Sequence, residues 1–104
     1  MKIVYSKYIP FKGFKAINLF GIIIVRKGLT LSQTEFRHEA IHTAQMKEML
    51  YIGFYLWYIV EWLIRLFKKG NAYRNISFEQ EAYCNQHRPN YFYERPHFGW
   101  LNYL

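Results

Sequence analysis

The chain has 104 residues, enough for one domain with one core, and we predict a single domain over 1–104. Hydrophobic residues make up 52% of the sequence and aromatic residues 21%. This composition excludes intrinsic disorder and supplies more apolar surface than a small monomer readily buries. Fourteen Lys and Arg against seven Glu give a net charge of +7, which favours partners that carry negative charge.

The sequence also bears on where the protein acts. Its one cysteine, Cys84, cannot form a disulfide within the chain, which fits a reducing compartment. Residues 1–7 lack the apolar stretch of a secretory signal peptide, so we expect a cytoplasmic protein, either free or at a membrane surface. The sequence shows neither a zinc finger nor the aromatic motif of an RNA-binding sheet, and we expect no nucleic-acid partner.

The first quarter of the chain is typical of β-structure. We predict a short strand near Lys2–Tyr5, followed by a loop. A second strand is predicted within 18–27, because the β-branched run Ile22–Val25 stands between Gly21 and Gly28.

The next segment predicts a helix over Gln33–Lys47. Ser32 and Glu35 have the spacing of a capping box, in which each side chain bonds the backbone N–H of the other residue. An apolar stripe follows at helical spacing, formed by Phe36, Ala40, Ile41 and Ala44.

The most hydrophobic segment, Met49–Phe67, predicts a second helix. Its uncharged part, 49–60, is shorter than the roughly 18–20 residues that a membrane-spanning helix needs. We expect the tyrosine-bearing side to face outward and the apolar side to face the core. That expected core side comprises Gly53, Leu56, Trp57, Val60, Leu63, Ile64 and Phe67. The alternative is that the helix 50–67 lies on a membrane surface or forms a homo-oligomer, because its aromatic residues stand beside Lys and Arg.

A third, short helix is predicted over Phe78–Gln86, with Ser77 as its N-cap and Pro89 beyond its end. The aromatic tail 90–104 is expected to lie back on the core. Together these elements predict an α+β fold, in which short strands pack on three helices.

One motif in the first predicted helix points to chemistry. His38, Glu39 and His42 form the pattern HExxH. Because four residues make about one helical turn, both imidazoles project from one face and can hold Zn²⁺. Glu39 lies beside them, in the position of the general base of metal-assisted hydrolysis.

A catalytic zinc site has a third protein ligand and one open position. Glu48 follows His42 by six residues and therefore faces away from it on a helix. Glu61 has a simpler role as the i,i+4 partner of Arg65, and His97 lies in a tail interrupted by proline.

The remaining ligand candidates are in and just after the third predicted helix. Glu79 and Glu81 are about 200° apart around a helix, so they cannot both face the metal. Glu81 has Arg88 available as a solvent-exposed partner, and His87 is a reserve ligand or a substrate-contacting residue.

An HExxH motif that is followed some tens of residues later by a helix with Glu-x-x-Ala resembles the gluzincin class of zinc metallopeptidases. The small single-domain minigluzincins are the most similar members, and the resemblance covers about 21–86. It implies that His38, His42 and Glu79 bind Zn²⁺. It also implies that Glu39 is the catalytic base.

The same resemblance bears on the residues around the metal. It implies a rim strand at Leu19–Lys27, whose main chain pairs with an extended substrate. Tyr83 stands where many gluzincins carry an Asp that orients a ligand. The nearest groups that can contact the substrate or stabilise the oxyanion of a tetrahedral intermediate are Tyr73, Tyr83 and His87.

These features favour a zinc-dependent metallopeptidase that hydrolyses a peptide or protein in a shallow cleft. One alternative is a non-catalytic, zinc-stabilised interaction module whose aromatic tail occupies the cleft. A related alternative is a peptidase that the same tail keeps inactive. A further one is a basic protein that binds a membrane surface or nucleic acid, in which the HExxH motif is incidental.

Overall fold

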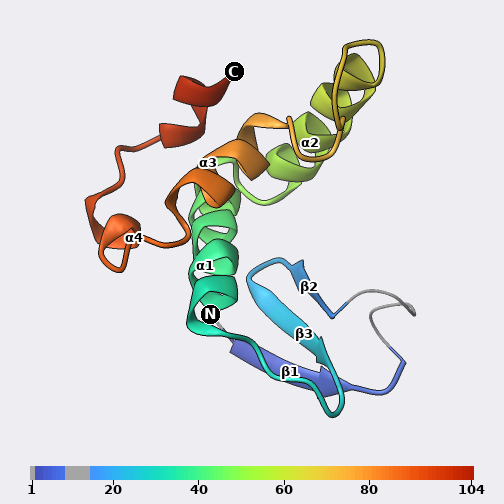
Figure 1. Ribbon diagram of the computed structural model, residues 1–104, viewed down its shortest axis with the longest axis vertical. Coiled ribbons are helices and arrows are strands. Elements are labelled where there is room, and N and C mark those ends of the chain that lie inside the picture. Colours follow the sequence, from blue (N-terminus) through green and yellow to red (C-terminus); the bar gives the residue numbers. More distant parts are fainter. Residues whose placement is uncertain (1, 9–14) are drawn as a thin grey trace.

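A three-stranded sheet stands beside a group of helices in the computed structural model, which describes residues 2–8 and 15–104 (Figure 1). The strands are β1 (Lys2–Ser6), β2 (Ala16–Leu19) and β3 (Ile22–Arg26), in the order β1-β3-β2. β1 runs parallel to β3, and β2 runs antiparallel to it. The predicted α+β class is confirmed. Most of the loop predicted after the first strand lies outside the described residues.

The strand predicted within 18–27 is in fact the second half of a hairpin. Phe20 and Gly21 have positive φ angles of 53° and 86°, and they form the two-residue turn between β2 and β3. Ile23 and Val25 of β3 are fully buried, in the alternation expected of a strand with one face on the core.

The helix α1 (Gln33–Glu48) begins as the sequence predicts. Ser32 Oγ accepts a hydrogen bond from the Glu35 backbone N–H at 3.1 Å, and the Glu35 carboxylate accepts one from the Ser32 N–H at 3.0 Å. This capping box fixes the first turn of the helix and with it the register of the HExxH motif.

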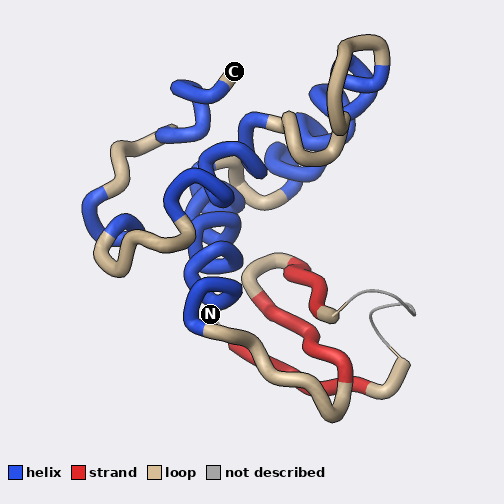
Figure 2. The backbone as a smooth tube through the Cα atoms, in the orientation of Figure 1, coloured by secondary structure: helices blue, strands red, loops and turns tan. Residues whose placement is uncertain are grey.

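α1 and α2 (Ile52–Leu66) meet at a sharp bend (Figure 2). Leu50 and Tyr51 have positive φ angles of 54° and 60°, so the predicted helix begins three residues later than Met49. Within 2–8 and 15–104, no one helix has both the length and the apolar content to cross a membrane. α1 and α2 taken together have the required length and apolar content, but the pair is bent by 108°.

The orientation expected for α2 is mostly wrong, although Trp57 of the expected core side does pack against the core. Phe54 and Glu61 are buried, whereas Leu56, Val60 and Leu63 of the expected core side are 43–61% exposed. Tyrosines turn inward because their hydroxyl groups have acceptors there, as described below for the site. The helix therefore buries Phe54 and Glu61 and exposes most of the side that was expected to face the core.

α3 (Ser77–Asn85) begins one residue earlier than predicted, with Ile76 as its N-cap. Ser77 is consequently the first helical residue. Its backbone N–H and its hydroxyl group both donate to the carboxylate of Glu61, each at 2.6 Å. Glu61 thus binds α2 to the start of α3, and its contact with Arg65, at 3.7 Å, is secondary.

The main core lies where α1, α2 and α3 meet. Phe78 is fully buried, stacks on Phe54 with ring centroids 4.5 Å apart, and contacts the edge of Trp100 at 4.9 Å. Met46 and Ile76 complete this cluster. Trp100 belongs to a 3₁₀ turn, Gly99–Tyr103, so the tail returns to the core as predicted.

A buried ion pair holds the tail in place. Glu81 is fully buried and accepts two hydrogen bonds from the Arg95 guanidinium group, both at 2.9 Å. Tyr91, in the short helix α4 (Tyr91–Glu94), donates a third at 2.7 Å. Gly99 passes so close that a Cβ there would lie 2.6 Å from the Glu81 carboxylate, so only glycine fits. The expected solvent-exposed partnership of Glu81 with Arg88 is wrong.

We expect Arg95→Ala to lower the free energy of unfolding by about 3–5 kcal/mol, because it leaves a buried carboxylate without its counter-charge. Urea unfolding followed by circular dichroism measures the loss. Lys68→Ala is the control, since the Lys68 side chain is exposed just after α2 and its removal should cost less than about 1 kcal/mol. Equal losses in the two variants would contradict the assigned importance of the buried pair.

Candidate functional site

Two histidines of α1 and one glutamate of α3 converge on one point. The Nε2 atoms of His38 and His42 lie 3.1 Å apart, and each lies 3.1 Å from Oε1 of Glu79. All three side chains are largely buried, at 12%, 8% and 3% exposed. They form a triad that can hold a metal ion. The structure therefore brings together the three residues that the resemblance places at the metal.

Two glutamines orient the imidazole rings. His42 Nδ1 lies 2.8 Å from Oε1 of Gln45, and His38 Nδ1 lies 2.8 Å from Oε1 of Gln86. An amide oxygen can only accept, so each Nδ1–H donates and each neutral imidazole keeps its Nε2 lone pair directed at the triad centre. The glutamines thus set the tautomer that a metal ligand requires.

The orientation of Gln45 is itself fixed by buried acceptors. Its amide nitrogen donates to the backbone carbonyl of Phe78 at 3.0 Å and to Glu81 Oε1 at 2.8 Å. Only its oxygen is then left to face His42. The Glu81–Arg95 pair therefore supports the triad through one intervening amide.

The second oxygen of Glu79 is bound to α2. Tyr58 donates its hydroxyl hydrogen to Oε2 at 2.8 Å, which leaves Oε1 for the histidines. Burial and the nearby Glu79 carboxylate raise the pKa of Tyr58, and the same two causes raise the pKa of Tyr73. Both phenols therefore stay protonated at neutral pH and act as hydrogen-bond donors.

Charge interactions within the triad are strong. Burial by itself would lower the pKa of His42. The Glu79 carboxylate, with smaller contributions from Glu39 and Gln45, outweighs the effect of burial and raises this pKa to about 9. Burial by itself would raise the pKa of Glu79, but His42 and His38 hold it below its usual range. The site is thus built for positive charge at its centre.

The donor set fits a metal ion better than it fits a proton. A proton can satisfy only one of the three 3.1 Å contacts at a time, whereas a cation at the centre satisfies all three. A tetrahedral ion bound by imidazole and carboxylate keeps neighbouring ligand atoms about 3.3–3.4 Å apart, close to the observed separations. Two nitrogens and one oxygen also leave a fourth position free of protein.

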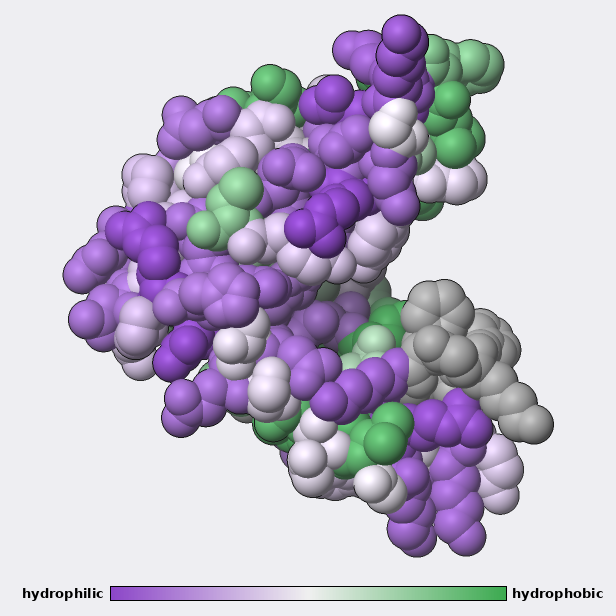
Figure 3. Space-filling view, viewed as in Figure 1, coloured by the Kyte–Doolittle hydropathy of each residue, from purple (hydrophilic) through white to green (hydrophobic). Residues whose placement is uncertain are grey.

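The triad opens into a groove of about 410 Å³ between the sheet and α2. Figure 3 shows the hollow between these two parts of the molecule. Glu39, His42 and Glu79 line it, and Tyr58 and Tyr73 line it from the side of α2. The predicted catalytic base therefore shares one solvent-accessible space with two of the three triad residues.

The strand that borders the groove is β2, which corrects the rim strand expected at Leu19–Lys27. β3 supplies most of that range, but it is the central strand and pairs with both neighbours. All four residues of β2 line the groove, so its edge runs along it. Asn18 holds this strand to α1 by donating to the Glu39 carbonyl at 3.2 Å and to Thr43 Oγ1 at 3.1 Å.

The three predicted contact residues are placed differently from one another. Tyr73 lines the groove. The Tyr83 ring packs edge-on against His38, with centroids 4.6 Å apart, under the Arg74 guanidinium group at 4.2 Å. His87 is exposed beside Gln86 and is not part of the triad.

The other ligand candidates lie away from the triad. Glu81 faces Arg95, and Glu61 faces Ser77. Glu48 pairs with Arg95 at 3.1 Å and with His97 at 3.2 Å. Each of these carboxylates is thus occupied by a structural partner.

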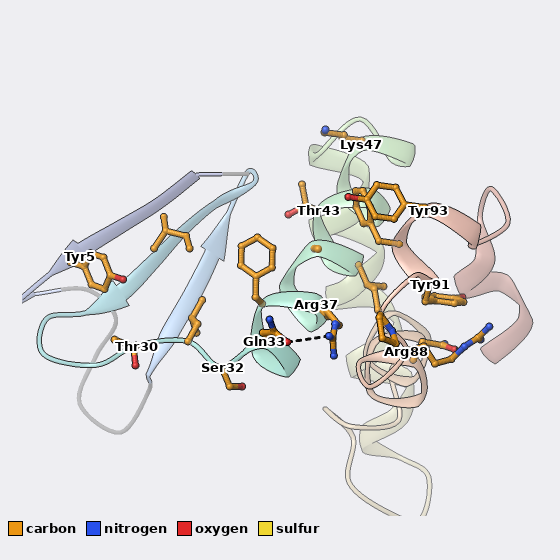
Figure 4. A pocket seen from close by; sticks show the side chains of 18 residues that line it. Tyr5, Thr30, Ser32, Gln33, Arg37, Thr43, Lys47, Arg88, Tyr91 and Tyr93 are labelled. Carbon is orange, nitrogen blue, oxygen red and sulfur yellow. Dashed lines mark hydrogen bonds between the residues drawn. The ribbon is translucent and has the colours of Figure 1, made fainter.

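A second cavity, of about 620 Å³, lies on a different face of α1 (Figure 4). Arg37 and Lys47 line it from α1, and Tyr91 and Tyr93 line it from the tail. Tail residues line this cavity, whereas the described residues that line the groove all lie within 16–79. The tail therefore does not line the groove in this structure, and the tail-blocked peptidase stays a prediction.

Three residues of the site escaped the sequence analysis. Gln45 follows His42 by three residues, and Gln86 follows Glu79 by seven, so helical spacing places each on the same face as its neighbour. That spacing is the signal that could have found them. Tyr58 had no such local signal, because its role depends on how α2 packs.

Comparison with models of protein families, with curated proteins and with solved structures finds no match to this chain.

We expect Tyr58→Phe to weaken the binding of a divalent metal ion about tenfold, because the variant loses the hydrogen bond that fixes the second oxygen of Glu79. Competition with a chelator measures the affinity. Tyr93→Phe is the matched control, since its side chain is 84% exposed in the tail. An affinity in Tyr58→Phe equal to that of the control would contradict the role assigned to Tyr58.

Proposed function

We propose that the protein is a zinc-dependent peptidase of the gluzincin type. The observation that carries this proposal is the convergence of His38, His42 and Glu79 beside Glu39, in a groove bordered by a strand edge. A purely structural zinc site is closed by four protein ligands, whereas three ligands and an accessible fourth position are typical of a catalytic site.

The residues present fit Zn²⁺. Two imidazole nitrogens and one carboxylate oxygen are the ligand set of several zinc hydrolases, and the two glutamines hold the rings in the tautomer that coordination needs. When bound, zinc supplies Lewis acidity and lowers the pKa of water towards about 7.

Glu39 is the residue that moves protons in this proposal. It lines the groove next to His42, so its carboxylate can take a proton from the attacking water and return it to the leaving amine. Asn18 binds the backbone carbonyl of Glu39 and thereby holds this turn of α1 close to β2.

The groove can also hold and polarise an extended peptide. The Tyr55 hydroxyl group already binds the main chain at the end of β2, because it donates to the Asn18 carbonyl and accepts from the Phe20 N–H. In this proposal the rest of the outer edge of β2 bonds a substrate strand, which gives affinity with little dependence on sequence. Tyr73 lines the same space with its hydroxyl group protonated, and in this proposal it is the donor to the oxyanion of the tetrahedral intermediate. The substrate class is therefore an unfolded or extended polypeptide segment.

Metal content tests the ligand assignment. We expect purified wild-type protein to hold one equivalent of zinc and Glu79→Ala to lose most of it, because the variant removes one of three ligands. Glu94→Ala, which removes an exposed carboxylate, should keep the full equivalent. Elemental analysis after zinc-replete purification gives the stoichiometry. Less than about half an equivalent in the wild type would contradict the zinc site.

Hydrolysis of an unstructured peptide tests the reaction. We expect Glu39→Gln to keep its zinc and to lower kcat by at least about a hundredfold, because the general base is lost while the ligands remain. Mass spectrometry of the products measures the cleavage. A wild-type protein that binds zinc but cleaves no unstructured peptide would favour the non-catalytic, zinc-stabilised module instead.

A further inference from the structure

The helix α2 exposes a continuous apolar face, here named the outer face of α2. Its members are large hydrophobic side chains that are 39–91% exposed: Ile52, Leu56, Ile59, Val60, Trp62, Leu63, Ile64, Leu66 and Phe67. Figure 3 shows hydrophobic side chains along the outer margin of the region that α2 occupies. A contiguous apolar surface of this kind marks a site of interaction.

The width of this face limits what can cover it. Successive residues are about 100° apart around the helix axis. Trp62 and Ile64 therefore mark the two sides of the outer face, and the arc between them, which contains all the other members, spans about 200°. A partner helix packs along a narrower stripe and would leave the flanks of such a face in water. A lipid surface can cover the whole arc, because acyl chains and headgroups adapt to the shape of the helix.

The charges around the outer face are of one sign. Between residues 49 and 76 the only acidic residue is Glu61, which is buried and bonded to Ser77. The basic residues in the same stretch are Arg65, Lys68, Lys69 and Arg74. Lys68 and Lys69 are exposed directly after the helix, beside Phe67. Long basic side chains in this position can reach anionic headgroups while the apolar face is buried.

We propose that the outer face of α2 binds to the surface of an anionic lipid bilayer, with the helix lying in the plane of the membrane interface. Apolar burial and attraction to anionic headgroups act together, and stable attachment to a membrane takes two such contributions. The chain's net charge of +7 acts in the same direction and opposes close contact between two copies at this face.

This arrangement places the groove close to the membrane. Tyr58, on the inward side of α2, donates to Glu79, so the triad lies about one helix diameter, roughly 10 Å, from the outer face. Polypeptide segments that emerge from the bilayer would be concentrated there. The membrane contact itself does not depend on peptidase activity.

The test is co-sedimentation of the full chain with vesicles. We expect binding to phosphatidylcholine vesicles that contain phosphatidylglycerol, weaker binding to phosphatidylcholine alone, and a decrease as salt is raised. The double variant Leu56→Glu, Leu63→Glu should bind at least about tenfold more weakly, because it places charge in the buried arc. Lys68→Glu, Lys69→Glu should lose the preference for phosphatidylglycerol.

A matched double variant controls for the added negative charge. Leu101→Glu, Leu104→Glu changes two leucines of the tail that are 50% and 59% exposed, and it should bind like the wild type. Circular dichroism and metal content confirm that each variant is folded. The proposal would be overturned if the wild-type protein did not bind vesicles, or if the two double leucine variants bound them equally well. The proposal would also be overturned if light scattering showed the wild-type protein to be a dimer that does not bind vesicles, and if Leu56→Glu, Leu63→Glu abolished that dimer.

Discussion

Three atoms with lone pairs meet at one point in this molecule, and the rest of the structure is arranged around that constraint. His38 and His42 come from α1, and Glu79 comes from α3, with 3.1 Å between each pair of atoms. Such a cluster is unfavourable unless positive charge lies at its centre. The contact between α1 and α3 therefore joins two of the main helices of the core and forms the place that can hold a metal ion.

Hydrogen bonds extend this constraint outward in two directions. Towards the tail, Gln45 connects His42 to the buried carboxylate of Glu81, which the guanidinium group of Arg95 neutralises. Towards α2, Tyr58 holds the second oxygen of Glu79. His42 is thus oriented by a glutamine that buried groups hold in turn, and Glu79 is fixed by Tyr58, which reduces the freedom of the triad to move apart.

Local patterns were enough to predict α1, its capping box and the shared face of the two histidines, because all of these depend on spacing within one helix. The orientation of α2 was not predictable in this way. Its hydrophobicity indicated which side chains avoid water, but the buried side was decided by acceptors elsewhere, such as Glu79 for Tyr58. The partner of Glu81 was missed for the same reason, since Arg95 comes from a separate element. Long-range pairs of this kind leave no periodic signal.

The position of Arg95 in the chain has a consequence for fragments of the protein. A fragment that ends before Arg95 would contain all three residues of the triad, but the Glu81 carboxylate would lack its counter-charge. Burying that carboxylate alone is costly, so α3 would pack weakly against α1 in such a fragment. The triad therefore depends on an arginine that is not one of its members.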